Sequence, residues 1–150
     1  MSTDFDAIVV GAGSVGLACG YALARQGQSV AVLERERRVG AGISSRNSEV
    51  IHAGLHYPPG SLKARFCVEG RRLLYEFLDR HHVAYNQCGK LIVATQDSEL
   101  AALDALAARA ESNGVEGVTR LDAAQALALE PALRTVGALH SAESGVFDAH

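Results

Sequence analysis

Two stretches of this sequence combine residue types and spacings that can do chemistry. The first is GAGSVG, a glycine series with Gly11, Gly13 and Gly16, which is followed further along by an acidic residue, Glu34. The second is SSRNSEVIHAGLHYPPGSLKAR, residues 44–65, which brings hydroxyls, an amide, a tyrosine and two histidines into one run broken by glycine and proline. Glycine turns can hold phosphates, and imidazoles can transfer protons. Together the two stretches predict a phosphorylated ligand with chemistry beside it.

If a strand precedes the glycine series and a helix follows it, each glycine is required for a physical reason. Gly11 permits the tight turn, Gly13 lets the backbone approach a pyrophosphate, and Gly16 lets the helix lie close to the strand. The N-terminus of that helix offers free N–H groups and a partial positive charge to the phosphates. Glu34 can accept hydrogen bonds from ribose hydroxyls, but it would repel a 2′-phosphate. The sequence therefore predicts NAD or FAD and argues against NADP.

The elements that must position these residues are recognisable in the first third of the chain. The apolar run DAIVV ends at Gly11 and predicts a strand buried on both faces, and residues 29–34, SVAVLE, predict a second one. Between them residues 13–26 predict a helix that closes on Gly27. Such a βαβ unit crosses over right-handed. The run ERERRVGAGISSRNS then continues with glycines and hydroxyls where an NAD domain would turn into its next helix, which favours FAD and its further flat ring system.

The rest of the chain predicts helices around one clear strand. The predicted elements are a helix capped by Ser61 that reaches about His81, a strand over residues 90–95, a helix over residues 97–112, and a shorter helix from Asp122 that stops at Pro131. The long helix is expected to bury one apolar face, made of Leu62, Phe66, Leu73, Leu74, Phe77 and Leu78. A soft domain boundary is expected near residues 82–88.

Composition indicates a globular chain. It has 150 residues, of which 48% are hydrophobic and 21% charged, and a net charge of −3, which argues against disorder and against a nucleic-acid binder that relies on bulk charge. Cys19, Cys67 and Cys88 lack any C-x-x-C spacing, so buried reduced thiols are expected and no metal site is predicted. The acidic N-terminus and short apolar runs predict no secretion signal and no transmembrane segment. A cytoplasmic location is expected, with peripheral contact at the inner face of a membrane left open.

Three segments carry a resemblance to a known family: residues 6–36 with the glycine series, residues 40–70 with the polar run, and QCGKLIVAT at residues 87–95. On these segments the chain resembles the D-amino-acid-oxidase-like FAD-dependent oxidoreductases, and within them the L-2-hydroxyglutarate dehydrogenase branch. The resemblance implies an α/β fold, a Rossmann-like FAD-binding domain of the D-amino-acid-oxidase (GR2) type, joined to the start of a mixed α+β substrate domain.

The resemblance also implies how the chain divides. Residues 1–85 would be the N-terminal part of the FAD-binding domain, residues 86–145 the first part of the substrate domain, and residues 146–150 a return towards the FAD domain. Only two parallel strands are clear in the first part, whereas a doubly wound sheet usually has about five or six strands. The chain is therefore expected to be the N-terminal part of a longer protein.

The resemblance assigns the FAD contacts to three groups of residues. These are Gly11, Gly13, Ser14, Val15 and Gly16 for the pyrophosphate; Glu34 and Arg35 for the adenosine end; and Ser44, Ser45, Arg46, Asn47 and Ser48 for the ribityl chain and isoalloxazine. Hydroxyls and amides of this kind can hydrogen-bond the ribityl oxygens and ring nitrogens. The alternative for Ser44, Asn47 or Ser48 is that the residue caps a short helix over residues 48–53.

Catalysis is assigned to His52, His56 and Tyr57. Related glycerol-3-phosphate dehydrogenases have a similar stretch, H-G-G-L-R-Y, at the reactive face of the flavin, and here it reads HAGLHY. His56 replaces the arginine, which counts against a glycerol-phosphate substrate. His52 could orient the substrate or accept its hydroxyl proton. The alternatives are a structural hydrogen-bonding role for either histidine, or a covalent link from His52 to the flavin as in dimethylglycine-dehydrogenase-like relatives.

The resemblance implies an enzyme, an FAD-dependent oxidoreductase that oxidises a small 2-hydroxy acid such as L-2-hydroxyglutarate by hydride transfer from Cα to flavin N5. A quinone, a carrier protein or oxygen would accept the electrons, and the arginine that holds the substrate carboxylate is expected beyond residue 150. Two alternatives stay open. One is an amine or amino-acid oxidase acting on glycine, sarcosine or a D-amino acid; the other is a flavin- or nucleotide-binding module that catalyses nothing.

Overall fold

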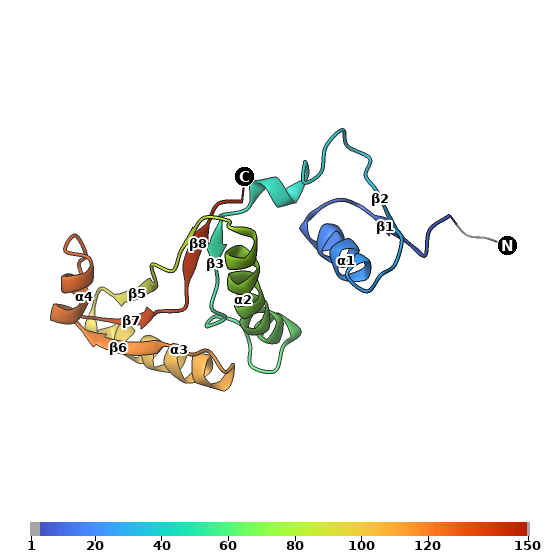
Figure 1. Ribbon diagram of the computed structural model, residues 1–150. Helices are drawn as coiled ribbons and strands as arrows, with labels where there is room; N and C mark the ends of the chain where they lie inside the picture. The colour runs from blue at the N-terminus through green and yellow to red at the C-terminus, as the bar shows by residue number, and fades with distance from the viewer. Residues whose placement is uncertain (1–3, 150) are drawn as a thin grey trace. The chain divides into compact units, whose positions relative to one another are not determined.

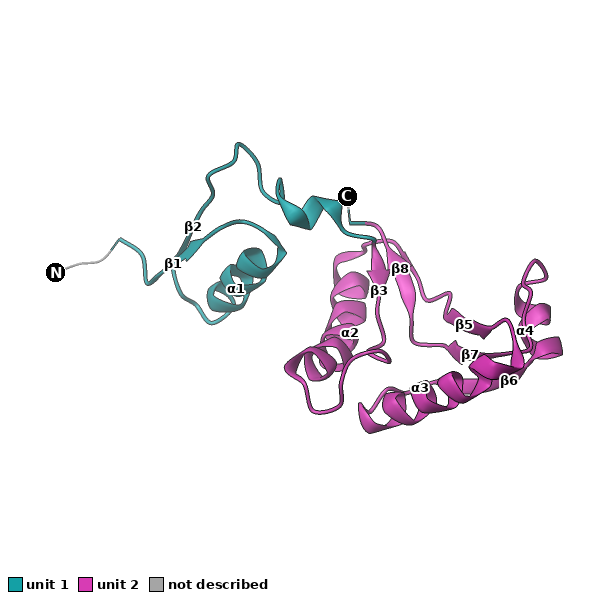
Figure 2. Cartoon of the chain, turned by 180° about the vertical axis from the view of Figure 1, so that it is seen from behind, with its two compact units in different colours: residues 1–48, 149–150 teal, residues 49–148 magenta. Residues whose placement is uncertain are grey.

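The computed structural model describes residues 4–149, and the chain divides into two compact units (Figure 2). Unit 1 consists of residues 1–48 with 149–150, and unit 2 consists of residues 49–148. The sequence places its boundary further along, near residue 85. The long helix that the sequence assigns to the FAD-binding part therefore belongs to unit 2. How the complete protein divides into domains stays a prediction.

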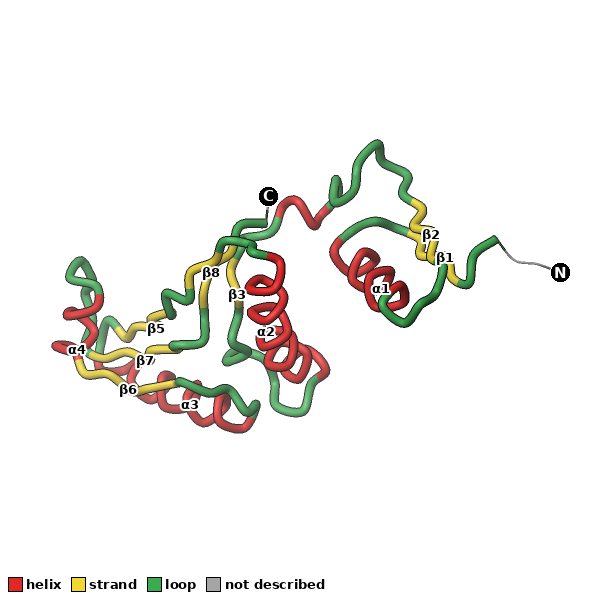
Figure 3. The backbone as a smooth tube through the Cα atoms, in the orientation of Figure 1, coloured by secondary structure: helices red, strands yellow, loops and turns green. Residues whose placement is uncertain are grey.

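Unit 1 has the βαβ arrangement that the sequence predicts. Its described elements are β1 (Ala7–Val10), α1 (Ser14–Ala24), β2 (Val30–Leu33) and the 3-10 helix η1 (Ile43–Arg46). β1 and β2 pair in parallel with Ala7 opposite Val30, and α1 lies beside the pair (Figure 3). Gly27 follows the helix with a φ of 83°, and its N–H donates to the Ala24 carbonyl at 2.9 Å. The glycine stop is therefore confirmed.

The strands of unit 1 are not buried on both faces, contrary to the prediction. In β1, Ile8 is 60% exposed and Val10 is 83% exposed. Among the described residues β1 and β2 make a two-stranded sheet, and α1 is the helix that packs on it. Within the described residues a single helix covers one face of this pair, and the apolar side chains on the other face are exposed.

Unit 2 contains two small antiparallel sheets with helices packed around them (Figure 1). The first sheet has the order β3-β8-β4, with β3 (Val50–Ile51), β8 (Gly145–Phe147) and β4 (Tyr85–Asn86). The second has the order β5-β7-β6, with β5 (Lys90–Ala94), β7 (Gly137–Ser141) and β6 (Val118–Asp122). The helices are α2 (Leu62–His81), α3 (Leu100–Ser112) and α4 (Ala123–Leu129), with the 3-10 helix η2 (Asp97–Glu99) before α3. Helix α3 packs along the second sheet.

Side-chain caps begin two of these helices where the sequence predicts them. Ser61 Oγ accepts a hydrogen bond from the N–H of Ala64 at 3.1 Å, at the start of α2. Asp122 and Gln125 form a capping box before α4, in which each side chain accepts from the backbone N–H of the other residue, at 2.8 and 3.0 Å. Helix α4 ends just before Pro131, which cannot continue a helix.

Helix α2 buries a different face from the predicted one. Its buried residues are Ala64, Val68, Arg71 and Leu78, whereas Leu62, Phe66, Leu73 and Phe77 are exposed. The face with smaller side chains can approach the segment after β3, where Ala53 and Leu55 form a core cluster with Val68. The prediction is right for Leu78, which is buried, and partly right for Leu74, which is half-buried. It is wrong for the four exposed residues because α2 has apolar residues on more than one face, and the larger side chains do not decide which face packs.

The cysteines are free thiols, and they are less buried than the sequence predicts. Cys19 and Cys88 are exposed, and Cys67 is half-buried. In α1 it is Gly20, the neighbour of Cys19, that faces the sheet, since a Cβ at Gly20 would lie 3.3 Å from the Val32 side chain.

Among residues 4–149, no helix is long and apolar enough to cross a membrane.

Candidate functional site

The glycine loop between β1 and α1 has a backbone that requires glycine. Gly11 has a φ of 99°, and its N–H donates to the Leu33 carbonyl at 2.7 Å, which ties the end of β1 to the end of β2. At Gly16 a Cβ would lie 1.9 Å from the Gly11 carbonyl oxygen, so a larger residue cannot fit unless the loop moves. The tight turn and the close approach of helix to strand are confirmed.

Glu34 holds the glycine loop from the end of β2. Its Oε2 accepts a hydrogen bond from the N–H of Ala12 at 2.7 Å, and its Oε1 accepts one from the N–H of Glu36 at 2.9 Å. These backbone donors, first Glu36 and then Ala12, lower the pKa of Glu34. An ionised carboxylate has about four acceptor positions, so Glu34 can keep both contacts and still bind ribose hydroxyls. The neighbouring Arg35 is exposed, and its Nε lies 3.5 Å from Oε1 of Glu36.

Ser44 brings the polar run to the start of α1. Its Oγ accepts a hydrogen bond from the N–H of Ser14 at 2.9 Å and lies 3.4 Å from the Ser14 hydroxyl. Gly13 permits this approach, because a Cβ there would be 3.1 Å from Ser44 Oγ. Two groups of residues that the sequence separates by 30 positions therefore meet at one helix N-terminus.

The rest of the run forms η1 and the turn after it. Ser45 Oγ donates to the Gly42 carbonyl at 3.0 Å, and Asn47 Nδ2 donates to the Ser44 carbonyl at 2.7 Å. Residues 50 and 51 belong to strand β3, so the alternative of a capped helix over residues 48–53 is wrong. Three other predicted cofactor contacts have exposed side chains: Val15, Arg46 and Ser48.

These residues of unit 1 fit a dinucleotide such as FAD. In the first turn of α1 the Ser14 N–H donates to Ser44 Oγ, whereas the N–H groups of Val15 and Gly16 have no carbonyl partner within the helix and can donate to a pyrophosphate. The loop in front of them has no side chain at Gly11 or Gly13 to keep a phosphate away. A carboxylate at the end of β2 and hydroxyls along η1 supply acceptors and donors for the sugar parts of the ligand.

The predicted catalytic residues lie together in unit 2, in the loop that follows β3. His52, His56 and Tyr57 line a small pocket with Lys90, the first residue of β5, and Ser144, which precedes β8. The pocket has a volume of about 10 Å³. Such a volume accommodates about one water molecule. Both histidines therefore border the same small space, and both are also exposed to solvent.

Positive charges surround both histidines. Lys90 Nζ lies 3.4 Å from His56 Nε2. Burial, then the charges of Lys90 and Lys63, lower the pKa of His52. Burial, then Lys90, His52 and Arg109, lower the pKa of His56. Both imidazoles are thereby shifted towards the neutral form, which is the form that can accept a proton. These cations are not recognisable as neighbours of the histidines in the sequence, because long-range folding brings them to the loop.

Asn113 and Cys67 hold the histidine loop in place. Asn113 Nδ2, just after α3, donates to the carbonyls of Gly54 and Tyr57 at 3.1 and 2.9 Å. Cys67 Sγ, in α2, donates to the carbonyl of His52 at 3.2 Å. The sequence marks Asn113 as the end of a helix, and nothing in its neighbourhood predicts a partner 56 residues away.

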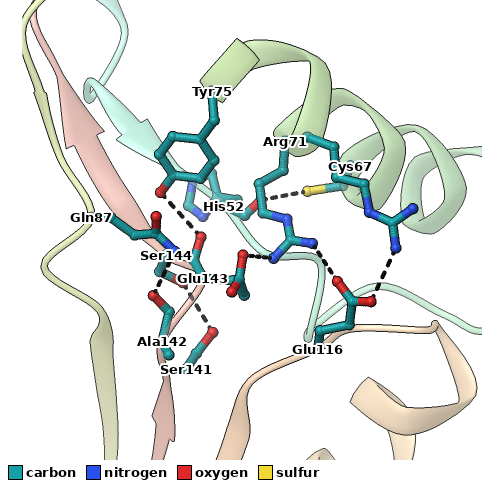
Figure 4. Close-up of polar contacts among 11 residues, drawn as sticks. His52, Cys67, Arg71, Tyr75, Gln87, Glu116, Ser141, Ala142, Glu143 and Ser144 are labelled. Atoms are coloured by element: carbon teal, nitrogen blue, oxygen red, sulfur yellow. Dashed lines mark hydrogen bonds and ion pairs between the residues drawn. The ribbon is translucent and has the colours of Figure 1, made fainter. Parts of the chain in front are cut away.

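A buried arginine links the segments around this loop (Figure 4). The Arg71 side chain is 2% exposed, and its guanidinium contacts Glu143 in the turn between β7 and β8 and, at 3.5 Å, Glu116 before β6. Tyr75 donates its hydroxyl to the Glu143 carbonyl at 3.2 Å, and Arg72 contacts Glu116 at 3.2 Å from the exposed side. The network therefore fixes the β7–β8 turn, which borders the histidine pocket.

The chain is similar to known flavoproteins. A sequence model of the family described as FAD dependent oxidoreductase matches residues 6–150. The mitochondrial L-2-hydroxyglutarate dehydrogenase of Arabidopsis thaliana is 48% identical over 97% of this chain, and that of Homo sapiens is 39% identical over 98%. Among solved structures, dithionite-reduced L-alpha-glycerophosphate oxidase from Mycoplasma pneumoniae with FAD bound has a TM-score of 0.85 at 28% identity, covering 99% of this chain and 40% of its own. Glycine oxidase from Geobacillus kaustophilus has a TM-score of 0.82 at 25% identity, covering 97% and 41%.

The chain spans about a third of the length of these curated relatives, 30% of the Arabidopsis protein and 32% of the human one.

The names of the relatives also correct the expected location. The cytoplasmic location expected from the sequence is contradicted, because the matching dehydrogenases are named mitochondrial.

Proposed function

Because this chain belongs to the family of FAD dependent oxidoreductases, we propose that the whole protein is an enzyme that oxidises a small 2-hydroxy acid of the L-2-hydroxyglutarate type. The cofactor of the family is FAD. The observation that carries the proposal is the identity of 38–48% with proteins named L-2-hydroxyglutarate dehydrogenase, over 96–98% of this chain.

In this proposal, unit 1 supplies the FAD contacts. The loop from Gly11 to Gly16, with Ser14 and Val15 in the first turn of α1, binds the pyrophosphate through backbone N–H groups. Glu34 binds the adenosine ribose, with Arg35 beside it. The run from Ser44 to Ser48 lies along the ribityl chain and the isoalloxazine. The hydrogen bond from the Ser14 N–H to Ser44 Oγ supports this assignment, because it brings the run next to the first turn of α1, where the N–H groups of Val15 and Gly16 would bind the phosphates.

The residues of unit 2 handle the proton of the reaction. Oxidation of a 2-hydroxy acid removes a hydride from Cα and a proton from the hydroxyl, which leaves a 2-oxo acid. When bound, FAD supplies the acceptor for the hydride. His52 takes the hydroxyl proton, since burial and nearby lysines keep it neutral. His56 and Tyr57 offer hydrogen bonds that orient the substrate. The final electron acceptor would be a quinone, a carrier protein or oxygen.

A second candidate is the oxidation of an amine or amino acid. The observation that favours it is the match to glycine oxidase, with a TM-score of 0.82 at 25% identity. Loss of hydride from a carbon next to nitrogen needs the same arrangement of ring, C–H bond and proton acceptor. The same loop could therefore serve either chemistry, and the choice depends on which substrate reduces the cofactor.

The test is a reduction experiment on the full-length protein loaded with FAD. We expect L-2-hydroxyglutarate, without oxygen, to bleach the visible absorption of the oxidised flavin, and glycine, sarcosine and D-amino acids to leave it unchanged. The variant His52→Ala should retain its flavin and lose turnover on the order of 100-fold, as for a general base. Bleaching by an amino acid and by none of the 2-hydroxy acids would replace the first candidate with the second.

A further inference from the structure

Lys90 makes a contact with His56 that determines the hydrogen-bonding pattern of the imidazole. Its Nζ lies 3.4 Å from His56 Nε2. A lysine ammonium has three N–H donors and no acceptor, and a neutral imidazole has one donor nitrogen and one acceptor nitrogen. For this contact to be a hydrogen bond, Nζ must donate and Nε2 must accept. That arrangement requires the ring proton of a neutral His56 to be on Nδ1.

The same contact makes Nε2 of His56 a poor site for a second proton. Protonation there would turn the acceptor into a donor that faces another donor, and it would place two cations 3.4 Å apart. Two like charges at that distance disfavour each other even where water screens them. His56 is therefore suited to donate a hydrogen bond through Nδ1 and unsuited to accept a proton through Nε2.

His52 differs from His56 in this respect. Within residues 4–149, no hydrogen bond involves its ring nitrogens, and the contact with Cys67 uses only its backbone carbonyl. Both histidines line the same pocket. One of them therefore has its acceptor nitrogen covered by a cation, and the other keeps its acceptor nitrogen available.

We propose that Lys90 is a positioning residue that holds His56 as the neutral tautomer with its proton on Nδ1, so that His56 is the hydrogen-bond donor of the pocket and His52 is the proton acceptor. This division of roles rests on the proposed oxidation of a hydroxy acid, whereas the effect of Lys90 on the tautomer of His56 does not. Lys90 acts through His56 and is not itself a catalytic residue.

The charged groups that face the histidines come from several elements. Those around His56 are Lys90 of β5, Arg109 of α3 and His52 of the same loop. Those around His52 are Lys90 and, from α2, Lys63. In the described part of the chain neither lysine forms an ion pair with a carboxylate. No carboxylate therefore neutralises the positive charge of these lysines. Lys90 affects both histidines, whereas Lys63 affects His52.

This difference provides a matched pair of variants. Lys90→Met removes the donor at His56 Nε2 together with a charge that acts on both histidines. Lys63→Met removes a charge that acts on His52 and leaves the contact with His56 intact. Lys90→Arg replaces one group that only donates with another, so it should preserve the tautomer. All three are made in the full-length protein with FAD bound, and thermal unfolding checks that each variant is folded.

The tautomer is read by two-bond ¹H–¹⁵N correlation NMR on protein labelled with ¹⁵N-histidine, with His56 assigned from its loss in His56→Asn. We expect the pattern of an Nδ1–H tautomer near neutral pH in the wild type, in Lys90→Arg and in Lys63→Met, and loss of that pattern in Lys90→Met. An Nε2–H or doubly protonated His56 in the wild type overturns the proposal, as does an unchanged pattern in Lys90→Met. The wild-type spectrum decides the matter even if a variant fails to fold.

The pH profile of kcat/KM tests the division of roles. Because both lysines lower the pKa of His52, the acid limb should move to higher pH in Lys63→Met and in Lys90→Met, and the loss of activity should be larger at pH 6 than at pH 9. An acid limb that stays in place in both variants would remove His52 as the proton acceptor. If no 2-hydroxy acid reduces the flavin, the proposed function fails, and the NMR pattern still decides whether Lys90 sets the tautomer.

Discussion

The side-chain amide of Asn113 donates a hydrogen bond to the carbonyl oxygen of Tyr57 at 2.9 Å, so the end of one helix holds the loop that carries both histidines. The same nitrogen donates to the carbonyl of Gly54 at 3.1 Å, where the backbone turns with a φ of 105°. A residue remote in sequence thus supports two carbonyls on either side of His56. The position of that imidazole depends on an amide that never faces the pocket.

Replacement of Asn113 should therefore loosen the loop. In Asn113→Ala both carbonyls lose their donor, and we expect the free energy of unfolding to fall by about 1–3 kcal/mol. Asn113→Asp should be even less stable than Asn113→Ala, although its side chain has nearly the shape of asparagine. The reason is that a carboxylate would face two carbonyl oxygens with no proton to donate. Urea unfolding of the full-length protein measures both effects. The adjacent Ser112→Ala is the control, and its exposed position should limit the change to about 0.5 kcal/mol. Equal stability of Asn113→Asp and the wild type would contradict this account.

A methyl group at Gly16 should disrupt the cofactor loop. The Cβ of Gly16→Ala would lie 1.9 Å from the Gly11 carbonyl oxygen, which is backbone and cannot rotate away. We expect the loop to shift, with a loss of stability of about 1–3 kcal/mol as for other overpacked sites. The purified full-length variant should also contain much less FAD than the wild type, as measured by its visible absorption. A variant with full flavin content would show that the loop does not need this close approach.

Gly70→Ala is the matched substitution in a glycine that has space around it. Gly70 lies inside helix α2, and a Cβ there would meet nothing within 4 Å. Alanine is the better helix former by about 0.5–1 kcal/mol, so the variant should be more stable by roughly that amount and should bind FAD normally. The midpoint of urea unfolding reports the difference. A destabilised Gly70→Ala would mean that this side of α2 is in contact with another surface.

The first part of the fold could be predicted because its determinants are local. Gly11, Gly16 and Gly27 each mark a backbone conformation or approach that few other residues allow, and they bracket one helix between two strands of apolar residues. Ser61 and Asp122 likewise begin helices through hydrogen bonds to residues three positions away. Such features are visible in the sequence without knowledge of the rest of the molecule.

The features that the sequence analysis missed depend on contacts between distant residues. Strands β7 and β8 are short segments without clear alternation, and each becomes a central strand only by pairing with two others. Lys90 reaches His56 across 34 positions, and the burial of Arg71 is possible because Glu143, 72 positions away, lies beside it. An arginine on a helix is predicted to face solvent, and only the fold supplies the carboxylates that make its burial tolerable.

Arg71 should be far more important for stability than its neighbour Arg72. Both contact Glu116, but the Arg71 side chain is 2% exposed and the Arg72 side chain 58%. Arg71→Met would leave the half-buried Glu143 without its partner, and we expect a loss of about 3 kcal/mol, at the lower end of the range for a broken buried pair. Arg72→Met removes an exposed pair, which should change stability by less than about 1 kcal/mol. Urea unfolding compares the two, and similar losses in both would contradict a structural role for the buried guanidinium.

Stability should also fall with decreasing pH below the ordinary histidine pKa of 6.5, because the fold lowers the pKa of both His52 and His56. Between the lowered values and 6.5, the unfolded chain binds protons that the folded chain does not, so acidification favours unfolding. The carboxylates with lowered pKa values, such as Glu34, act below their ordinary value of 4.5, which lies outside this window. We therefore expect the urea midpoint of the full-length protein to drop from pH 7.5 to pH 5.5, and to drop less in His52→Asn/His56→Asn. The same drop in that double variant would show that other groups titrate and that the two imidazoles are not held neutral by the fold.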